Sequence, residues 1–392
     1  MSYDYDVVVV GARVAGASTA MLLARQGHRV VMVERAAVPS DTVSTHAITR
    51  SGVVQLSRWG LLDEVLDAGT PAVREVTLGF GDQRIDFEVR SEFGVDHFVA
   101  PRRYLLDGVL AEAAQDAGAE LRDGTIFKSL LRNDSGRVDG VVVKGDGGPT
   151  PIRARFVVGA DGHHSRVAGQ ADSFVYRSHE PLNAVNYAYF DGIDHRGFWF
   201  QFTPEVNTGL VPTNDDQCLV FAGRPTRQKG AFSRDPDGEF MALIRRGGTD
   251  LADIVAAGHR ASRFHGTSGL SGFLRQPYGP GWALVGDAGY TEDPISAHGI
   301  SDALRDAELC ARAIDTALGD PSLEDAAFGW YHEMRDRVSV DVYEAAADLA
   351  RYEWDPDTAS RRMRTISEAT RAECELLTGL PRWDRVPVPL SA

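Results

Sequence analysis

The sequence predicts an α/β fold with two domains and a helical C-terminal part. Three observations support this prediction: a strand–helix–strand unit occupies the first 34 residues, short aromatic strands crowd residues 173–223, and helical patterns dominate from residue 298 onward. The chain of 392 residues is long enough to hold two or three domains with a large core.

The N-terminal unit begins with an apolar run at residues 4–10, which is the pattern of a buried parallel strand. Residues 15–26 predict a helix with small residues on one side, which Gly27 ends, and residues 29–33 predict a second apolar strand. A strand, a helix and a second strand within about thirty residues are typical of a Rossmann-like βαβ unit.

The loop of this unit, residues 11–16, reads GARVAG and is close to the dinucleotide pattern G-x-G-x-x-G. The backbone amides of Val14, Ala15 and Gly16 lie where they can hold a pyrophosphate at the positive end of the helix dipole. Glu34 ends the second strand, where its carboxylate can accept hydrogen bonds from a ribose. The unit as a whole therefore predicts a dinucleotide site.

Arg13 stands where the dinucleotide pattern has its second glycine, which normally lets the pyrophosphate approach bare backbone. We expect the Arg13 guanidinium to cross the loop and donate charge-assisted hydrogen bonds to the phosphate oxygens, because its planar fork matches phosphate. The alternative is that the side chain points to solvent and that the loop tolerates it.

The middle of the chain alternates between helix and strand. A helix is expected over residues 102–117, closed by Gly118. Strands are expected at residues 120–121, 126–131, 138–143 and 153–158, with a hairpin turn at residues 133–136. The last of these strands leads into the sequence GADG at residues 159–162.

Residues 173–223 change character, because short strands such as 186–190, 197–202 and 218–223 are dense in aromatic residues and suggest an antiparallel sheet. Neighbouring side chains of a strand point to opposite faces, so at most half of the aromatic group at residues 198–202 can face a pocket. A helical and polar stretch follows. Further elements are then expected as a strand at 282–285 and helices at 298–318, 322–350 and 358–377.

Composition excludes several classes of function. The net charge of −15 argues against a nucleic-acid partner, which needs a basic face. No apolar run reaches the roughly 18 residues of a membrane span, and the N-terminus lacks a signal-peptide pattern, so we expect a cytoplasmic protein. Three scattered cysteines predict neither a disulfide framework nor a metal site. The sequence leaves the oligomeric state open.

Three motifs, taken in order, resemble the fingerprints of FAD-dependent monooxygenases of the para-hydroxybenzoate hydroxylase type. They are GARVAG with Glu34, then FVVGADGHHSR at residues 156–166, and then ALVGDAGYTEDPISAHGISDA at residues 283–303. Arg103 with Leu106-Asp107 is similar to that family's R-x-x-L-D helix start. The resemblance covers roughly residues 5 to 320.

The resemblance implies a Rossmann-like FAD-binding domain that is interrupted by an antiparallel-sheet substrate domain. The FAD-binding domain is then expected at residues 1–76, 99–172 and 277–320, the substrate domain at residues 77–98 and 173–276, and the C-terminal helices at residues 321–392.

The resemblance also implies a reaction. NAD(P)H reduces FAD, O2 forms the C4a-hydroperoxide, and one oxygen atom is inserted into a small aromatic or polyketide-like substrate. A related fold serves a second reaction, the reduction of carbon–carbon double bonds by flavin enzymes similar to geranylgeranyl reductases, and this alternative stays open. The sequence lacks the W-x-W-x-I-P stretch of flavin halogenases, which argues against halogenation.

The family's motifs assign cofactor contacts to particular positions. Asp287 is expected at the ribityl chain, and Pro294 with His298-Gly299-Ile300 at the flavin ring, where a helix N-terminus can stabilise negative charge. Asp161 belongs to a D-G motif associated with FAD and its reduction. The full set of expected cofactor contacts is Gly11, Arg13, Val14, Ala15, Gly16, Glu34, Arg35, Arg103, Phe127, Asp161, Asp287, Pro294, His298, Gly299 and Ile300.

Two departures and one open question remain. Besides Arg13, the flavin-side motif reads P-I-S-A-H-G where the family favours P-x-x-G-Q-G, so that His298 replaces glutamine. The catalytic residues stay unassigned. His46 and His298 are candidates, but a lone histidine is more often structural than catalytic.

Overall fold

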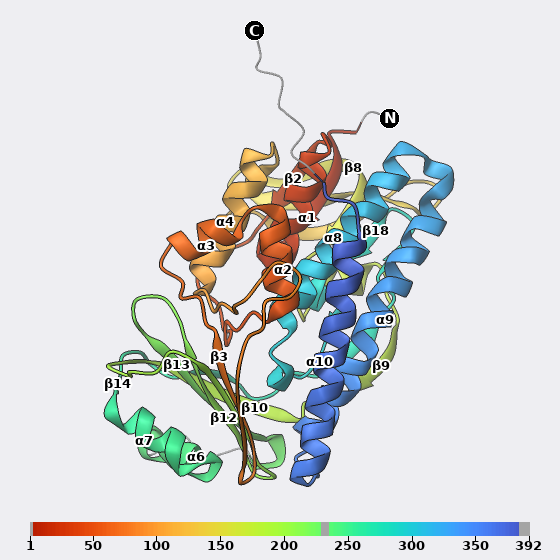
Figure 1. Ribbon diagram of the computed structural model, residues 1–392. Helices are drawn as coiled ribbons and strands as arrows, with labels where there is room; N and C mark the ends of the chain where they lie inside the picture. Colours follow the sequence, from red (N-terminus) through yellow and green to blue (C-terminus); the bar gives the residue numbers. More distant parts are fainter. Residues whose placement is uncertain (1–2, 229–234, 384–392) are drawn as a thin grey trace.

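A mostly parallel sheet forms the centre of one part of the chain in the computed structural model, which describes residues 3–228 and 235–383 (Figure 1). Its strands run in the order β17–β18–β8–β1–β2–β5, and neighbours from β18 to β5 pair in parallel. The strands are β1 (Tyr5–Val10), β2 (Val30–Val33), β5 (Glu120–Arg122), β8 (Gly148–Gly159), β17 (Tyr278–Gly279) and β18 (Trp282–Leu284).

Alternation along these strands builds a core on each face of the sheet. Val7 and Val9 of β1 pack against helices, while Val8 and Val10 pack against a hairpin. The helices are α1 (Val14–Arg25), α4 (Arg103–Asp116) and α8 (Gly299–Gly319), and the hairpin is β6 (Ile126–Arg132) with β7 (Val138–Gly145). Both faces are therefore covered, which explains why the central strands are apolar without interruption.

The second sheet has the order β14–β10–β13–β12–β11–β3–β4, with β15 beside β10, and is antiparallel except where β11 meets β3. It contains strands from two separate parts of the chain, as Figure 1 shows. These are β3 (Glu75–Phe80), β4 (Gln83–Glu88), β10 (Asn183–Asp191), β11 (Phe198–Phe202), β12 (Asn207–Pro212), β13 (Cys218–Pro225), β14 (His259–Arg260) and β15 (His265–Thr267).

The two faces of this second sheet have different partners. Trp199 and Leu210 pack against α6 (Pro236–Gly247) and α7 (Thr249–Ala257). Phe198 lies on the opposite face, with Tyr187 and Tyr189 of β10. The aromatic group at residues 198–202 thus divides between the faces, as its alternation predicts.

Helices at the C-terminus bridge the two parts. α9 (Glu324–Ala350) and α10 (Pro356–Gly379) pack on each other, α9 also packs on α8, and both contribute to a core that includes Phe80 and Phe202 of the second sheet. The helix α2 (Arg50–Trp59) contacts both α8 and α10, and the short α3 (Leu62–Asp67) follows it.

The remaining elements are short. They are the helix α5 (Arg166–Gln170), a three-stranded sheet of β9 (Val175–His179), β16 (Gly272–Arg275) and β19 (Tyr290–Thr291), and the 3₁₀ turns η1 (Thr226–Gln228), η2 (Gly286–Ala288), η3 (Pro294–Ser296) and η4 (Pro321–Leu323). No helix among the described residues combines the length and the apolar character that crossing a bilayer requires.

Candidate functional site

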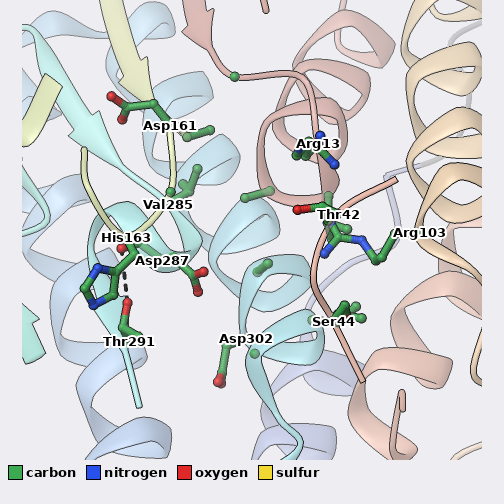
Figure 2. Close-up of a pocket in the computed structure, with 18 of the residues that line it drawn as sticks. Arg13, Thr42, Ser44, Arg103, Asp161, His163, Val285, Asp287, Thr291 and Asp302 are labelled. Carbon is green, nitrogen blue, oxygen red and sulfur yellow. Dashed lines mark hydrogen bonds between the residues drawn. The ribbon is translucent and has the colours of Figure 1, made fainter. Parts of the chain in front are cut away.

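A cavity of about 610 Å³ lies where the carboxyl ends of the parallel strands meet α1 and α8. This volume is within the range of ligand and cofactor sites in proteins. Fourteen of the fifteen expected cofactor contacts line it, together with the candidate His46; the exception is Gly16. Figure 2 shows the arrangement: Arg13, Thr42, Ser44 and Arg103 come from one side, and Asp161, Val285 and Asp287 from the other.

Gly16 has a packing role behind the cavity. A Cβ atom at this position would lie 1.8 Å from the carbonyl oxygen of Gly11, so any other residue would force the backbone to shift. Gly11 itself adopts a φ of +105°, and a Cβ there would lie 2.3 Å from the carbonyl oxygen of Ala160. The two glycines therefore let the start of α1 lie directly on the ends of β1 and β8.

Other residues of the protein accept some of the hydrogen bonds that the Arg13 side chain can donate. Its Nη1 donates to Asp107 Oδ2 at 2.9 Å and to the Ser40 carbonyl at 3.2 Å, and its Nη2 donates to Ser40 Oγ at 3.1 Å. Arg103 also donates to Asp107, at 3.0 Å from Nη2 to Oδ1. Burial raises the pKa of Asp107, and the two arginines oppose that shift. Arg13 therefore ties the loop to α4 while it still lines the cavity.

Glu34 holds the same loop from the other side. Its carboxylate accepts a hydrogen bond from the backbone N–H of Ala12 at 3.1 Å and from that of Ala36 at 3.0 Å. Arg35 and Phe127 line the cavity beside it. A carboxylate oxygen can accept more than one hydrogen bond, so both oxygens of Glu34 can still accept a hydrogen bond from a ligand.

Asp287 lies in η2, and its carboxylate faces the cavity (Figure 2). The carboxylate receives no hydrogen bond from any residue of the described ranges, whereas its backbone carbonyl accepts one from Thr291 Oγ1 at 3.2 Å. Burial raises the pKa of Asp287 to about 6, an effect that Asp302 and Asp306 strengthen and Arg103 weakens. The Asp287 carboxylate is therefore available to accept a hydrogen bond from a bound ligand.

The Asp161 carboxylate forms hydrogen bonds within the protein. Its carboxylate accepts hydrogen bonds from Ser165 Oγ at 2.5 Å and from the backbone N–H of Arg166 at 2.7 Å, at the start of α5. The carboxylate thus fixes the turn after β8, and the same turn forms one wall of the cavity.

His46 is buried, lines the cavity and has a left-handed backbone, with a φ of +64°. Its Nε2 shares a hydrogen bond with the Tyr189 hydroxyl, and the two rings stack with centroids 5.8 Å apart. Burial, followed by the charges of Arg103 and Arg102, holds the pKa of His46 well below its usual range. The imidazole is therefore neutral at physiological pH.

His298 precedes α8 and is held by two elements. Its Nδ1 lies 2.8 Å from the carbonyl oxygen of Ser296, which requires Nδ1 to donate, and its Nε2 lies 2.7 Å from Thr370 Oγ1 of α10. The preceding Ala297 has a φ of +58°. The family's glycine is replaced here by a residue that still adopts the left-handed conformation.

Sequence reasoning missed a group of buried acids beside α8. Glu292 and Asp302 line the cavity, and the acids behind them are Asp306 and Glu373. Burial, strengthened by Asp302, raises the pKa of Glu292 well above its usual range. Both cavity-lining acids lie within the third motif, which could have drawn attention to them. Nothing in a sequence, however, shows that acids so placed are buried.

The match to known proteins identifies the family. The family model described as "FAD binding domain" matches residues 4–346, which is most of the chain. The chain belongs to this FAD-binding family. It is an FAD-dependent oxidoreductase of the superfamily that includes para-hydroxybenzoate hydroxylase. This assignment confirms the predicted resemblance and the predicted fold.

Three relatives illustrate its range. The menaquinone reductase of Mycolicibacterium smegmatis is 31% identical over 333 residues, 79% of this chain and 76% of that protein. Digeranylgeranylglycerophospholipid reductase 1 of Methanopyrus kandleri is 27% identical over 361 residues, 88% of this chain and 90% of that protein. The crystal structure of PqsL, a probable FAD-dependent monooxygenase from Pseudomonas aeruginosa, is similar with a TM-score of 0.76 and 23% identity, over 93% of this chain and 99% of that one.

Proposed function

We propose that this flavoprotein is a monooxygenase that inserts one oxygen atom of O2 into a small aromatic or polyketide-like substrate, with NAD(P)H as the reductant. The observation that carries the proposal is the meeting of two cavities. The large cavity shares Thr45, Pro294 and Ala297 with a small, mostly apolar cavity of about 20 Å³. A mostly apolar pocket of this size beside the flavin site can hold a substituent of a ring that lies in the large cavity, and its apolar lining keeps water away from the reaction.

The residues of the large cavity fit FAD. The glycine contact between Gly11 and Gly16 brings the N-terminus of α1 to the cavity, where the amides of Val14 and Ala15 can hold the pyrophosphate. Glu34 is suited to the ribose, with Arg35 and Phe127 beside the adenine. Asp287 is suited to the ribityl chain. Pro294 and the start of α8, at His298, Gly299 and Ile300, are suited to the flavin ring.

Bound FAD would supply two-electron transfer from NAD(P)H and the activation of O2. The balanced reaction consumes substrate, NAD(P)H, a proton and O2, and it yields oxygenated substrate, NAD(P)⁺ and water. The protein then has to orient the substrate, exclude water and move one proton. His46 is the candidate for moving this proton, because its neutral imidazole lines the cavity and shares a hydrogen bond with the Tyr189 hydroxyl.

Oxygen labelling tests this proposal. With the purified FAD-loaded protein, NAD(P)H and a panel of simple phenols under ¹⁸O2, we expect a substrate that stimulates NAD(P)H oxidation and gains one ¹⁸O atom. One NAD(P)H should be consumed for each O2, with little hydrogen peroxide, because a closed apolar pocket couples reduction to product. NAD(P)H oxidation that yields only peroxide across the panel would count against these substrates.

A second candidate function is the reduction of a carbon–carbon double bond. The 31% identity to a menaquinone reductase favours it, because that relative covers most of this chain. The same assay without oxygen distinguishes the two functions. A substrate that gains two hydrogens and no oxygen under anaerobic conditions would replace the monooxygenase proposal with the reductase.

Arg13 supports the cofactor site in a way that binding measurements can isolate. The guanidinium has five N–H groups, and its bonds to Asp107 and Ser40 leave some free on the cavity side. Arg13→Ala should weaken FAD binding by about 1.5–3 kcal/mol, the value of a charged hydrogen bond, and high salt should reduce the difference. Titration of the apoprotein with FAD measures this effect. Arg29→Ala, an exposed arginine of the same βαβ unit, is the control. Equal FAD affinity of Arg13→Ala and wild type would place the side chain outside the phosphate site.

A further inference from the structure

Two polar side chains reach the small cavity beside the proposed flavin site. Its volume of about 20 Å³ is room for a single water-sized group. Most of its lining is apolar, and the polar residues of the lining are Thr45, Asn207 and Thr208. The hydroxyl oxygen of Thr208 has almost no accessible surface, so a bound group cannot contact it. Thr45 and Asn207 therefore supply the polar groups that a ligand in this cavity can meet.

The Asn207 amide presents its NH2 group to the small cavity. The Tyr352 hydroxyl donates to Oδ1 of Asn207 at 2.5 Å, which leaves the NH2 group as the free end of the amide. The NH2 nitrogen has no hydrogen-bond partner in the described ranges, and it retains accessible surface. Asn207 is only 4% exposed and lines the small cavity, so the space that its NH2 group reaches is this cavity.

The Thr45 hydroxyl lies at the junction of the two cavities, because Thr45 lines both of them. Within residues 3–228 and 235–383 this hydroxyl has no hydrogen-bond partner, and it too retains accessible surface. The backbone around it is held in place. The N–H of Ser44 donates to the Tyr187 hydroxyl at 3.1 Å, and the carbonyl of Thr45 accepts from the N–H of Ala47 at 2.8 Å.

The chemistry of these two groups selects the kind of ligand atom. An amide NH2 group only donates hydrogen bonds, whereas a hydroxyl group can donate or accept. The one kind of group that both can bind at the same time is therefore an acceptor. In a cavity that holds one water-sized group, a single oxygen atom can contact both walls. A carbonyl oxygen is suited to this place, because it has two lone pairs and can accept both hydrogen bonds.

We propose that Thr45 and Asn207 are specificity-determining residues that donate hydrogen bonds to a carbonyl oxygen on the substrate ring. This inference rests on the proposed function, since it takes the large cavity as the place of the flavin and of the substrate ring. It narrows the substrate class to cyclic ketones and quinones, whose carbonyl oxygen projects from the ring by a single atom.

The energetic reason is the cost of an unpaired donor. A ligand with a methylene group in place of the carbonyl oxygen would cover the Asn207 NH2 group without accepting its hydrogen bond, and would displace any water there. Sites built around such a polar group discriminate strongly against ligands that lack the matching group.

Binding to the oxidised FAD-loaded protein, without reductant, tests the inference. The probes are 1-indanone and 1-methyleneindane, which have nearly the same shape and differ in a carbonyl oxygen against a methylene group. From flavin absorbance changes and calorimetry, we expect 1-indanone to bind about tenfold or more tightly than 1-methyleneindane. In a pocket without donors the order would be reversed, because burial removes more hydration from a carbonyl group than from a methylene group.

Variants locate the effect. Thr45→Val removes the hydroxyl and keeps the shape of the side chain, so it should reduce the preference by about three- to tenfold. Asn207→Leu should reduce it likewise, and the Tyr352 hydroxyl then keeps an acceptor, since it also lies 2.8 Å from Oδ1 of Asn183. Thr208→Val is the matched control. It makes the same change in the same cavity at a shielded hydroxyl, and it should keep the full preference.

Equal or reversed affinities in the wild type, no binding of either probe, or an unchanged preference in Thr45→Val would overturn the inference. An equal loss of preference in Thr208→Val would overturn it as well. If Asn207→Leu does not fold, Thr45→Val decides alone, since the Thr45 hydroxyl makes no hydrogen bond to the described residues that the variant could lose. The proposed function fails differently, through absence of ¹⁸O transfer. That result leaves the binding preference of the oxidised protein untouched, so the two failures are distinguishable.

Discussion

The Asp287→Ala variant is expected to lose its flavin during purification. The Asp287 carboxylate faces the cavity and has no partner among the described residues, so it is available to the hydroxyl groups of the ribityl chain. Removing it leaves those hydroxyls without an acceptor, at a cost of about 1–3 kcal/mol for each unpaired group. Titrating the apoprotein with FAD should show the dissociation constant rising by about tenfold or more.

The melting temperature of the apoprotein distinguishes a loss of flavin binding from unfolding of the variant. Because the folded-state pKa of Asp287 is raised to about 6, its contribution to stability is present at low pH and is lost as pH rises through that value. At pH 7.5 the carboxylate therefore does not stabilise the apoprotein, and apo Asp287→Ala should melt no lower than apo wild type. Asp315→Ala, at the far end of α8, should retain flavin. Full flavin retention in Asp287→Ala would remove Asp287 from the cofactor site.

The largest expected effect on folding is that of Arg305→Met. Arg305 is fully buried in α8, and its guanidinium lies 2.5 Å from Asp302, 2.8 Å from Asp306 and 3.6 Å from Glu373 of α10. Removing the cation leaves three buried carboxylates facing one another. Breaking a buried ion pair in this way costs about 3–5 kcal/mol. Thermal unfolding at pH 8.5 should show a melting temperature lower by about 5–15 °C.

The destabilisation by Arg305→Met should grow as the pH rises. Burial raises the pKa of Glu373 to about 8 even with Arg305 present. A raised pKa means stability that is lost as pH rises, so the destabilisation by Arg305→Met should be smaller at pH 6 than at pH 8.5. Arg351→Met, which breaks an exposed pair with Asp348, is the control and should cost less than about 1 kcal/mol. Equal melting curves for Arg305→Met and wild type would contradict the buried network.

The fold was predictable because its elements carry their own periodicity. The uninterrupted valines of β1 predict a strand covered on both faces, and the structure covers it with helices on one side and a hairpin on the other. The aromatic strands predict the antiparallel sheet. The parallel pairing of β11 with β3 was not predictable, since β3 comes more than a hundred residues earlier and no local pattern records its partner.

The residues of the functional site were also predictable only in part. Glycine loops and strand ends are local features, so fourteen expected contacts line the cavity. The bond between Arg13 and Asp107 joins residues 94 positions apart, and no local pattern indicates it. For the same reason the sequence does not reveal the buried acids beside the cavity. Gly16 was expected at the cofactor, but it packs against Gly11, a role that the third glycine of the pattern also has.

The contacts of α10 have a consequence for biosynthesis. His298 is held by Thr370, and Arg305 is paired with Glu373, so two groups at the start of α8 depend on residues of α10. A ribosome makes α10 after α8, so the acids of α8 emerge before Glu373 does. His298, which lines the cofactor cavity, thus gains its bond to Thr370 only after α10 has emerged from the ribosome.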